Sequence, residues 1–65
     1  MDRKEMEAIA MGGIERNCDW DDDASADSIY DDCYTAAFDV LVDKGVDHAT
    51  AREVAGNVAQ RFAQP

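Results

Sequence analysis

The residues best able to do chemistry in this chain are its aspartates. Nine of them lie within residues 17–43, which contain no Lys, Arg or His: Asp19, Asp21, Asp22, Asp23, Asp27, Asp31, Asp32, Asp39 and Asp43. Clustered carboxylates bind calcium, attract basic protein surfaces and repel nucleic acid. The formal net charge of −9 is therefore a local feature, since acids and bases balance in the rest of the chain.

The first aspartates partly match a calcium-binding EF-hand loop. Alternate loop positions hold an acid or a serine, namely Asp19, Asp21, Asp23, Ser25 and Asp27. Ala24 replaces the glycine of the sharp turn, and Tyr30 replaces the bidentate glutamate that completes the ligand shell. We therefore expect a solvated acidic loop with no metal and no cofactor. A weakly calcium-responsive helix pair is kept as a third interpretation.

Nucleophilic catalysis has little support in the sequence. Cys18 and Cys33 have no neighbouring cation that would favour a thiolate. His48 is the only histidine, and no partner residue suggests a base or a metal ligand. A chain of 65 residues also has little material for the walls of a substrate pocket. We expect a protein that is not an enzyme.

Aromatic residues stand among these acids. Trp20 lies inside the acidic run 19–23, where it is either an interface anchor ringed by charge or a cap on a small core. Tyr30 and Tyr34 flank further aspartates. We expect the partner-binding residues to be the nine aspartates together with Trp20, Tyr30 and Tyr34.

Three helices must position these residues. Hydrophobic periodicity predicts helices over about 2–17, 27–44 and 48–63, with an acidic connector at 18–26. Ser25 or Asp27 caps the second helix, Gly45 ends it in the left-handed conformation, and Asp47 caps the third. Because the join at 44–47 is short, the second and third helices should form an antiparallel hairpin. The fold class is an all-α three-helix domain.

Each helix has a predicted buried face. In the first helix it comprises Met6, Ile9, Ala10, Gly13 and Ile14, and in the third Ala51, Val54, Ala55, Val58, Ala59 and Phe62. Gly13 either lets another backbone approach closely or, with Gly12, weakens or kinks its helix. The second helix is apolar on most of its circumference, so the third helix must cover one side, and the first helix or a second subunit the other.

A polar strip of Asp32, Asp39 and Asp43 remains on the second helix. Acids near a helix C-terminus oppose its dipole, which suggests a functional surface, although a solubilising strip explains them too. Because a chain of this length is near the lower limit for folding alone, we expect a homodimer. The charged N-terminus indicates no signal peptide and no run could span a bilayer, so we expect a cytoplasmic protein without a disulfide.

In size, acidity and lack of a catalytic motif the chain resembles small phage-encoded anti-CRISPR and other host-takeover proteins. The resemblance implies a stoichiometric inhibitor of a host protein or defence complex. Its aspartates would mimic nucleic acid in a basic groove, without binding nucleic acid or membrane themselves. The alternative is a helical interaction module that docks a host regulator or ATPase through Tyr30, Tyr34, Phe38 and Val42.

Overall fold

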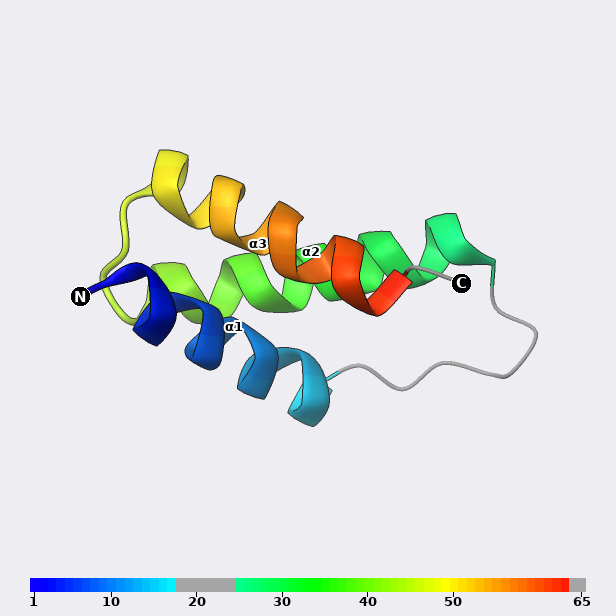
Figure 1. Cartoon of the computed structure of the whole chain (residues 1–65), viewed down its shortest axis with the longest axis horizontal. Coiled ribbons are helices and arrows are strands. Elements are labelled where there is room, and N and C mark those ends of the chain that lie inside the picture. Colours follow the sequence, from blue (N-terminus) through cyan, green and yellow to red (C-terminus); the bar gives the residue numbers. More distant parts are fainter. Residues whose placement is uncertain (18–24, 64–65) are drawn as a thin grey trace.

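The structure, a computed structural model, describes residues 1–17 and 25–63. These residues form three helices and no strand: α1 spans Arg3–Asn17, α2 Ala26–Asp43 and α3 His48–Ala63 (Figure 1). The all-helical prediction is confirmed, and every helix end lies within one residue of its expected position. One boundary needs correction, because Ala26 belongs to α2 and not to the connector predicted at 18–26.

Each helix begins at a side-chain oxygen that accepts a hydrogen bond from a backbone N–H three residues later. The pairs are Asp2 Oδ1 with Glu5 at 2.9 Å, Ser25 Oγ with Ser28 at 3.2 Å, and Asp47 Oδ2 with Thr50 at 3.0 Å. Such caps satisfy backbone donors that have no partner inside the helix. Of the two predicted caps for α2, Ser25 takes the position, and Asp27 lies in the first turn.

The turn between α2 and α3 is built around Gly45. This residue has φ of +93°, the left-handed conformation that glycine adopts without a steric penalty. The N–H of Gly45 donates to the Val42 carbonyl, and the N–H of Val46 donates to the Leu41 carbonyl, both at 3.0 Å. Together these bonds form a Schellman motif, which ends α2 and returns the chain as the antiparallel helix α3 (Figure 1).

The core lies where the three helices meet, and α2 and α3 pack most closely. Half of its ten buried hydrophobic residues are alanines: Ala10, Ile14, Cys33, Ala37, Leu41, Ala51, Val54, Ala55, Val58 and Ala59. The predicted faces of α1 and α3 are thereby confirmed, with Met6, Ile9 and Phe62 partly buried at the edges. Small side chains allow the helices to approach closely, although each alanine contributes little buried area.

α1 covers the side of α2 that α3 leaves open. Gly13 is buried at this contact, and a Cβ added to it would lie 2.6 Å from Val40 Cγ1 and 3.5 Å from the Ala36 carbonyl oxygen. α1 continues without interruption through both glycines. The close-approach interpretation of Gly13 is therefore correct, and the predicted two-sided cover of α2 comes from α1 and α3 of the same chain.

Candidate acidic and aromatic surfaces of α2

Five of the twelve predicted partner-binding residues lie outside the described residues. They are Asp19, Trp20, Asp21, Asp22 and Asp23. The alternatives for Trp20 lie there as well, as do Cys18 and the first half, 19–24, of the stretch that partly matches a calcium-binding loop. The other seven predicted residues all belong to α2.

The five aspartates of α2 are all exposed, and the helix carries no Lys, Arg or His. At 3.6 residues per turn they divide into two sets. Asp32, Asp39 and Asp43, here called the acidic ridge, follow one another at spacings of seven and four residues and face away from the core. Asp27 and Asp31 lie on another side of the helix. The structure thus separates aspartates that the sequence placed in a single stretch.

Three aromatic rings run along α2 beside Asp27 and Asp31. Tyr30, Tyr34 and Phe38, here called the aromatic stripe, are spaced four residues apart, and neighbouring ring centroids are separated by 6.1 Å. The ring planes of Tyr34 and Phe38 are nearly parallel, at 7°. The stripe ends at α3, where the His48 ring meets Phe38 edge-on with a centroid separation of 5.6 Å.

The aromatic stripe lies along the border between α2 and α3. A Cβ added to Gly56 of α3 would be 3.5 Å from Tyr30 Oη and 4.0 Å from Tyr34 Cε2. Gly56 thus leaves space beside the two tyrosines. Neither this contact nor the contact of His48 with Phe38 was predicted from the sequence. A glycine inside an otherwise regular helical pattern was the available signal, because such a glycine often has a packing reason.

The stripe and α1 lie on opposite flanks of α2. Buried Ala37 marks the centre of the core-facing side of the helix. Tyr34 and Phe38 lie to one side of it, whereas Ala36 and Val40, which contact Gly13, lie to the other. Among the described residues, α1 therefore does not cover the aromatic stripe.

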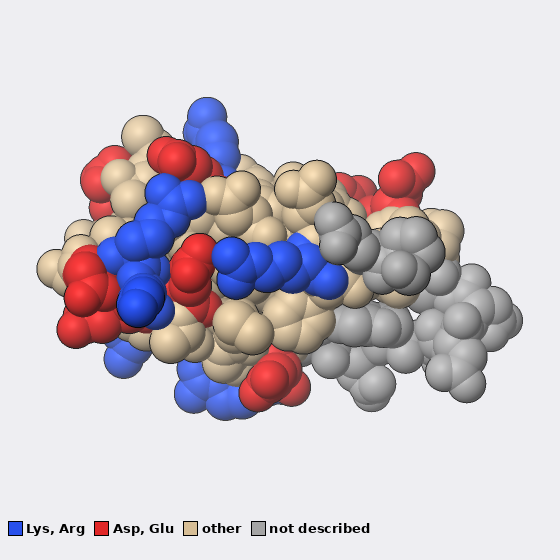
Figure 2. Space-filling view, viewed as in Figure 1, with Lys and Arg blue, Asp and Glu red and all other residues tan. Residues whose placement is uncertain are grey.

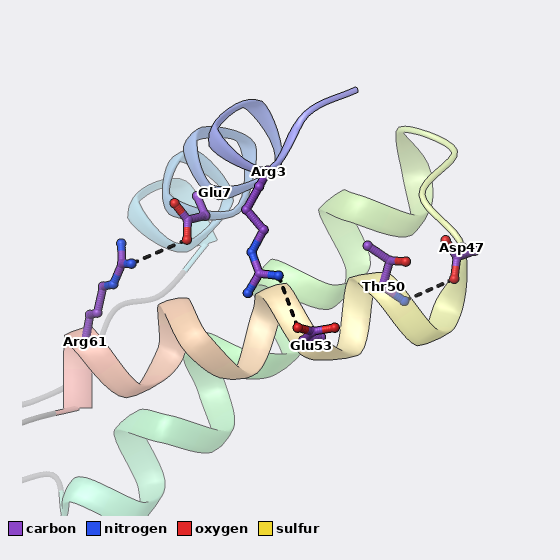
Figure 3. Close-up of polar contacts among 6 residues, drawn as sticks. All are labelled: Arg3, Glu7, Asp47, Thr50, Glu53 and Arg61. Carbon is purple, nitrogen blue, oxygen red and sulfur yellow. Dashed lines mark hydrogen bonds and ion pairs between the residues drawn. The ribbon is translucent and has the colours of Figure 1, made fainter.

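The other two helices carry charges of both signs, with three bases and three acids in α1 and two arginines and one glutamate in α3. Lys or Arg and Asp or Glu side chains are interspersed on the face that Figure 2 shows, over α1 and α3. Two ion pairs join these helices, Arg3 to Glu53 at 3.1 Å and Arg61 to Glu7 at 3.3 Å (Figure 3). In the part of the chain that the structure describes, the excess negative charge therefore belongs to α2.

The hydrogen bonds of the Asp47 carboxyl group favour its charged form. Hydrogen bonds from the side chain and then the backbone of Thr50 lower the pKa of Asp47 below its ordinary value. Figure 3 shows this carboxylate turned toward the start of α3. Its role at this position is helix capping.

Within residues 1–17 and 25–63, no group of three or more His, Cys, Asp or Glu side chains is placed to hold a metal ion. None of the helices there has the length and apolar character needed to cross a membrane. Comparisons of the chain with protein-family models, with curated proteins and with solved structures find no match. The function proposed below therefore rests on these residues and their placement.

Proposed function

We propose that this chain is a non-catalytic, stoichiometric inhibitor that binds a basic surface of a host protein or defence complex in the host cytoplasm and blocks it. The supporting observation is the charge distribution. All five aspartates of α2 are exposed on a helix without a base, whereas α1 and α3 carry both signs. A surface of one sign attracts an oppositely charged partner and speeds its encounter.

The partner surface we propose is one that normally holds nucleic acid. From Asp27 to Asp43, α2 rises about 24 Å, which gives roughly one carboxylate per 5 Å. One strand of duplex DNA carries a charge about every 3.4 Å. α2 alone is therefore less dense in charge than a single strand, and Asp19 and Asp21–Asp23 are the residues that would raise the density.

The test begins by identifying the partner in nuclease-treated host lysate and then measures competition directly. Fluorescence anisotropy follows the partner's binding to a labelled oligonucleotide as this protein is added. We expect displacement that weakens steeply as salt rises, because ionic contacts are screened. The variant Asp21→Asn, Asp22→Asn, Asp23→Asn should displace the oligonucleotide poorly.

Two matched double variants distinguish the contribution of the acidic ridge to binding from that of the overall net charge. Asp39→Asn with Asp43→Asn removes two charges from the ridge, and Glu5→Gln with Glu15→Gln removes two exposed charges from α1. We expect only the first pair to weaken displacement strongly. Equal effects of the two pairs, or displacement that is insensitive to salt, would contradict mimicry of nucleic acid by α2.

The alternative function, docking of a host regulator or ATPase on the apolar side of α2, is favoured by a separate observation. Tyr30 is 36% exposed, and Tyr34, Phe38 and Val42 are only partly buried. Binding of this kind would depend little on salt and would be lost in Tyr34→Ala or Phe38→Ala. Because both rings also pack on the core, each variant needs a melting curve to show that it folds.

A homodimer stays a prediction. The sequence left either the first helix or a second subunit to cover one flank of α2, and in the structure α1 covers it. Sedimentation equilibrium over a range of protein concentrations measures the oligomeric state directly. The third interpretation, a calcium-responsive helix pair, predicts that sub-millimolar calcium but not magnesium raises the melting temperature, and an unchanged melting curve would exclude it.

A further inference from the structure

The aromatic stripe combines ring surface with solvent access. Tyr34 and Phe38 pack partly on the core, whereas Tyr30, 36% exposed, continues the row of rings beyond it. The border with α3 at this end is formed by Gly56, which has no side chain to cover the tyrosines. The Tyr30 end of the stripe therefore lies close to α3 at Gly56, and Tyr30 keeps access to solvent.

Carboxylates stand beside both tyrosines. Asp27 precedes Tyr30 by three residues and Asp31 precedes Tyr34 by three, and residues at this spacing are neighbours on a helix surface, about 5–6 Å apart between Cβ atoms. Both aspartates are exposed. Each tyrosine thus has an acid on its outer side, and the two pairs repeat with the four-residue spacing of the stripe.

The opposite end of the border between the aromatic stripe and α3 has a different charge. Arg52 lies one turn before Gly56 on α3 and is exposed, and His48 lies a further turn away, against Phe38. The described part of this border is therefore acidic at its Tyr30 end and carries basic side chains toward the start of α3. A ligand whose cation lies beside Tyr30 and Tyr34 therefore avoids electrostatic repulsion by Arg52.

We infer that the exposed surface of Tyr30 and Tyr34, with Asp27 and Asp31 on its edge, is the docking site for an arginine side chain of a basic protein segment. A guanidinium stacks on an aromatic face and forms paired hydrogen bonds to a carboxylate, so it uses both features of the site. The α2 helix of a second copy fits this surface poorly, because it carries five aspartates and no base.

The inference rests on the proposed function in one respect, namely that the partner is basic. It adds that binding at this tyrosine surface is specific for side-chain type and position, whereas charge mimicry by the acidic ridge is not. Arginine docking beside the tyrosines and charge mimicry by the acidic ridge make different predictions for the aspartates of α2. An experiment can therefore contradict one and support the other.

The experiment uses the full chain, isotopically labelled for NMR, and a short amphipathic helical peptide with two arginines four residues apart. Control peptides carry lysine or citrulline in place of arginine; citrulline keeps the planar shape but has no charge. We expect the arginine peptide to shift resonances of Tyr30, Tyr34 and Gly56 and to leave those of Asp39 and Asp43 unchanged. Lysine should bind more weakly, and citrulline should not bind.

Two pairs of variants locate the site. Asp31→Asn and Asp39→Asn remove the same charge from exposed positions of α2, and only Asp31→Asn should weaken binding of the arginine peptide. Tyr30→Leu should weaken it about two- to fivefold, the value expected for losing a cation–π contact at an exposed site, whereas Tyr30→Phe should retain it. Circular dichroism melts establish that each variant is folded.

Three outcomes would overturn the inference. Equal losses of affinity for the arginine peptide in Asp31→Asn and Asp39→Asn would show diffuse charge attraction. Resonance shifts confined to the acidic ridge would place the arginine there. Shifts of Tyr30 and Gly56 that depend on protein concentration without peptide would assign this surface to a second copy. Specific arginine binding without displacement of nucleic acid from the host partner would support the arginine site and contradict the proposed inhibitor function.

Discussion

Gly13 of α1 lies so close to Val40 of α2 that a Cβ at the glycine would stand 2.6 Å from Val40 Cγ1 and 3.1 Å from Val40 Cβ. The second distance is the more restrictive, because a Cβ is fixed by its backbone and a change of side-chain rotamer does not move it. Neighbouring Gly12 has no such contact within 4 Å. The adjacent glycines therefore have different roles, and only Gly13 sets the separation of α1 from α2.

Alanine at the two glycines should have opposite effects on stability. Gly12→Ala gains helix propensity, and we expect its free energy of unfolding to rise by about 0.5–1 kcal/mol. Gly13→Ala has the same gain but incurs an overpacking cost of about 1–3 kcal/mol, so we expect a net loss of about 1 kcal/mol. Urea denaturation measures both. A Gly13→Ala protein as stable as Gly12→Ala would show that the close contact is not restrictive.

Asp47 should make stability depend on pH in the acid range. The pKa of Asp47 is lowered in the folded protein by its hydrogen bonds with Thr50, so the carboxylate stabilises the fold above the ordinary aspartate pKa of about 3.9. This contribution is lost as pH falls through the lower, folded-state pKa. We expect Asp47→Asn, in which the amide still caps the helix, to lack that dependence.

The measurement for Asp47 is the difference in melting temperature between wild type and Asp47→Asn from pH 7 to pH 2. A difference is needed because protonation of the many other acids relieves repulsion in both proteins. The melting temperature of the wild type should exceed that of the variant at higher pH, and this difference should be lost only below about pH 4. A difference that is constant across the whole range would show that the charge of Asp47 is unimportant.

Neutralising the acids at the two ends of α2 should separate dipole effects from general repulsion. Asp43 is the last residue of the helix and Asp27 lies in its first turn. At low salt, Asp43→Asn should raise the free energy of unfolding by roughly 0.3–1 kcal/mol relative to Asp27→Asn, since the helix dipole opposes an acid only at the C-terminal end. This difference in the free energy of unfolding between the two variants should become smaller in 1 M salt. Equal changes in the free energy of unfolding for the two variants would show that general repulsion among the acids, and not the helix dipole, determines the effect.

The two ion pairs that join α1 to α3 should differ in strength. Both Arg3 and Glu53 are well exposed, at 49% and 65% of their side chains, whereas Glu7 is only 23% exposed beside Arg61 at 59%. Exposed pairs contribute about 0.2–1 kcal/mol. Double-mutant cycles with methionine for arginine and glutamine for glutamate should therefore give the larger coupling for Arg61 with Glu7. The reverse order would show that geometry outweighs exposure at these pairs.

Much of the fold could be predicted because the deciding residues act locally. Asp47 caps α3 through an N–H three residues away, and Gly45 adopts its positive φ within the turn itself. The apolar faces of α1 and α3 follow from helical periodicity alone. Each of these features depends on residues within one or two turns of one another.

Contacts between helices were harder to predict. Periodicity gives the side of α2 that holds Tyr30 and Tyr34, but their contact with Gly56 depends on the rotation and axial position of α3. For the same reason the sequence does not decide between the two interpretations of Gly13, because its contact with Val40 depends on how α1 packs on α2. The candidate site is harder still to predict, because recognition depends on two surfaces and this chain contains one of them.

The Schellman turn at Gly45 also bears on the order of assembly. It brings α2 and α3 together through contacts between residues close in sequence, and such local contacts form rapidly. Docking of α1 must close a longer loop before Gly13 reaches Val40. We expect the hairpin to form in the folding transition state and α1 to dock afterwards. In stopped-flow experiments, Gly45→Ala should then slow folding, whereas Gly13→Ala should mainly accelerate unfolding.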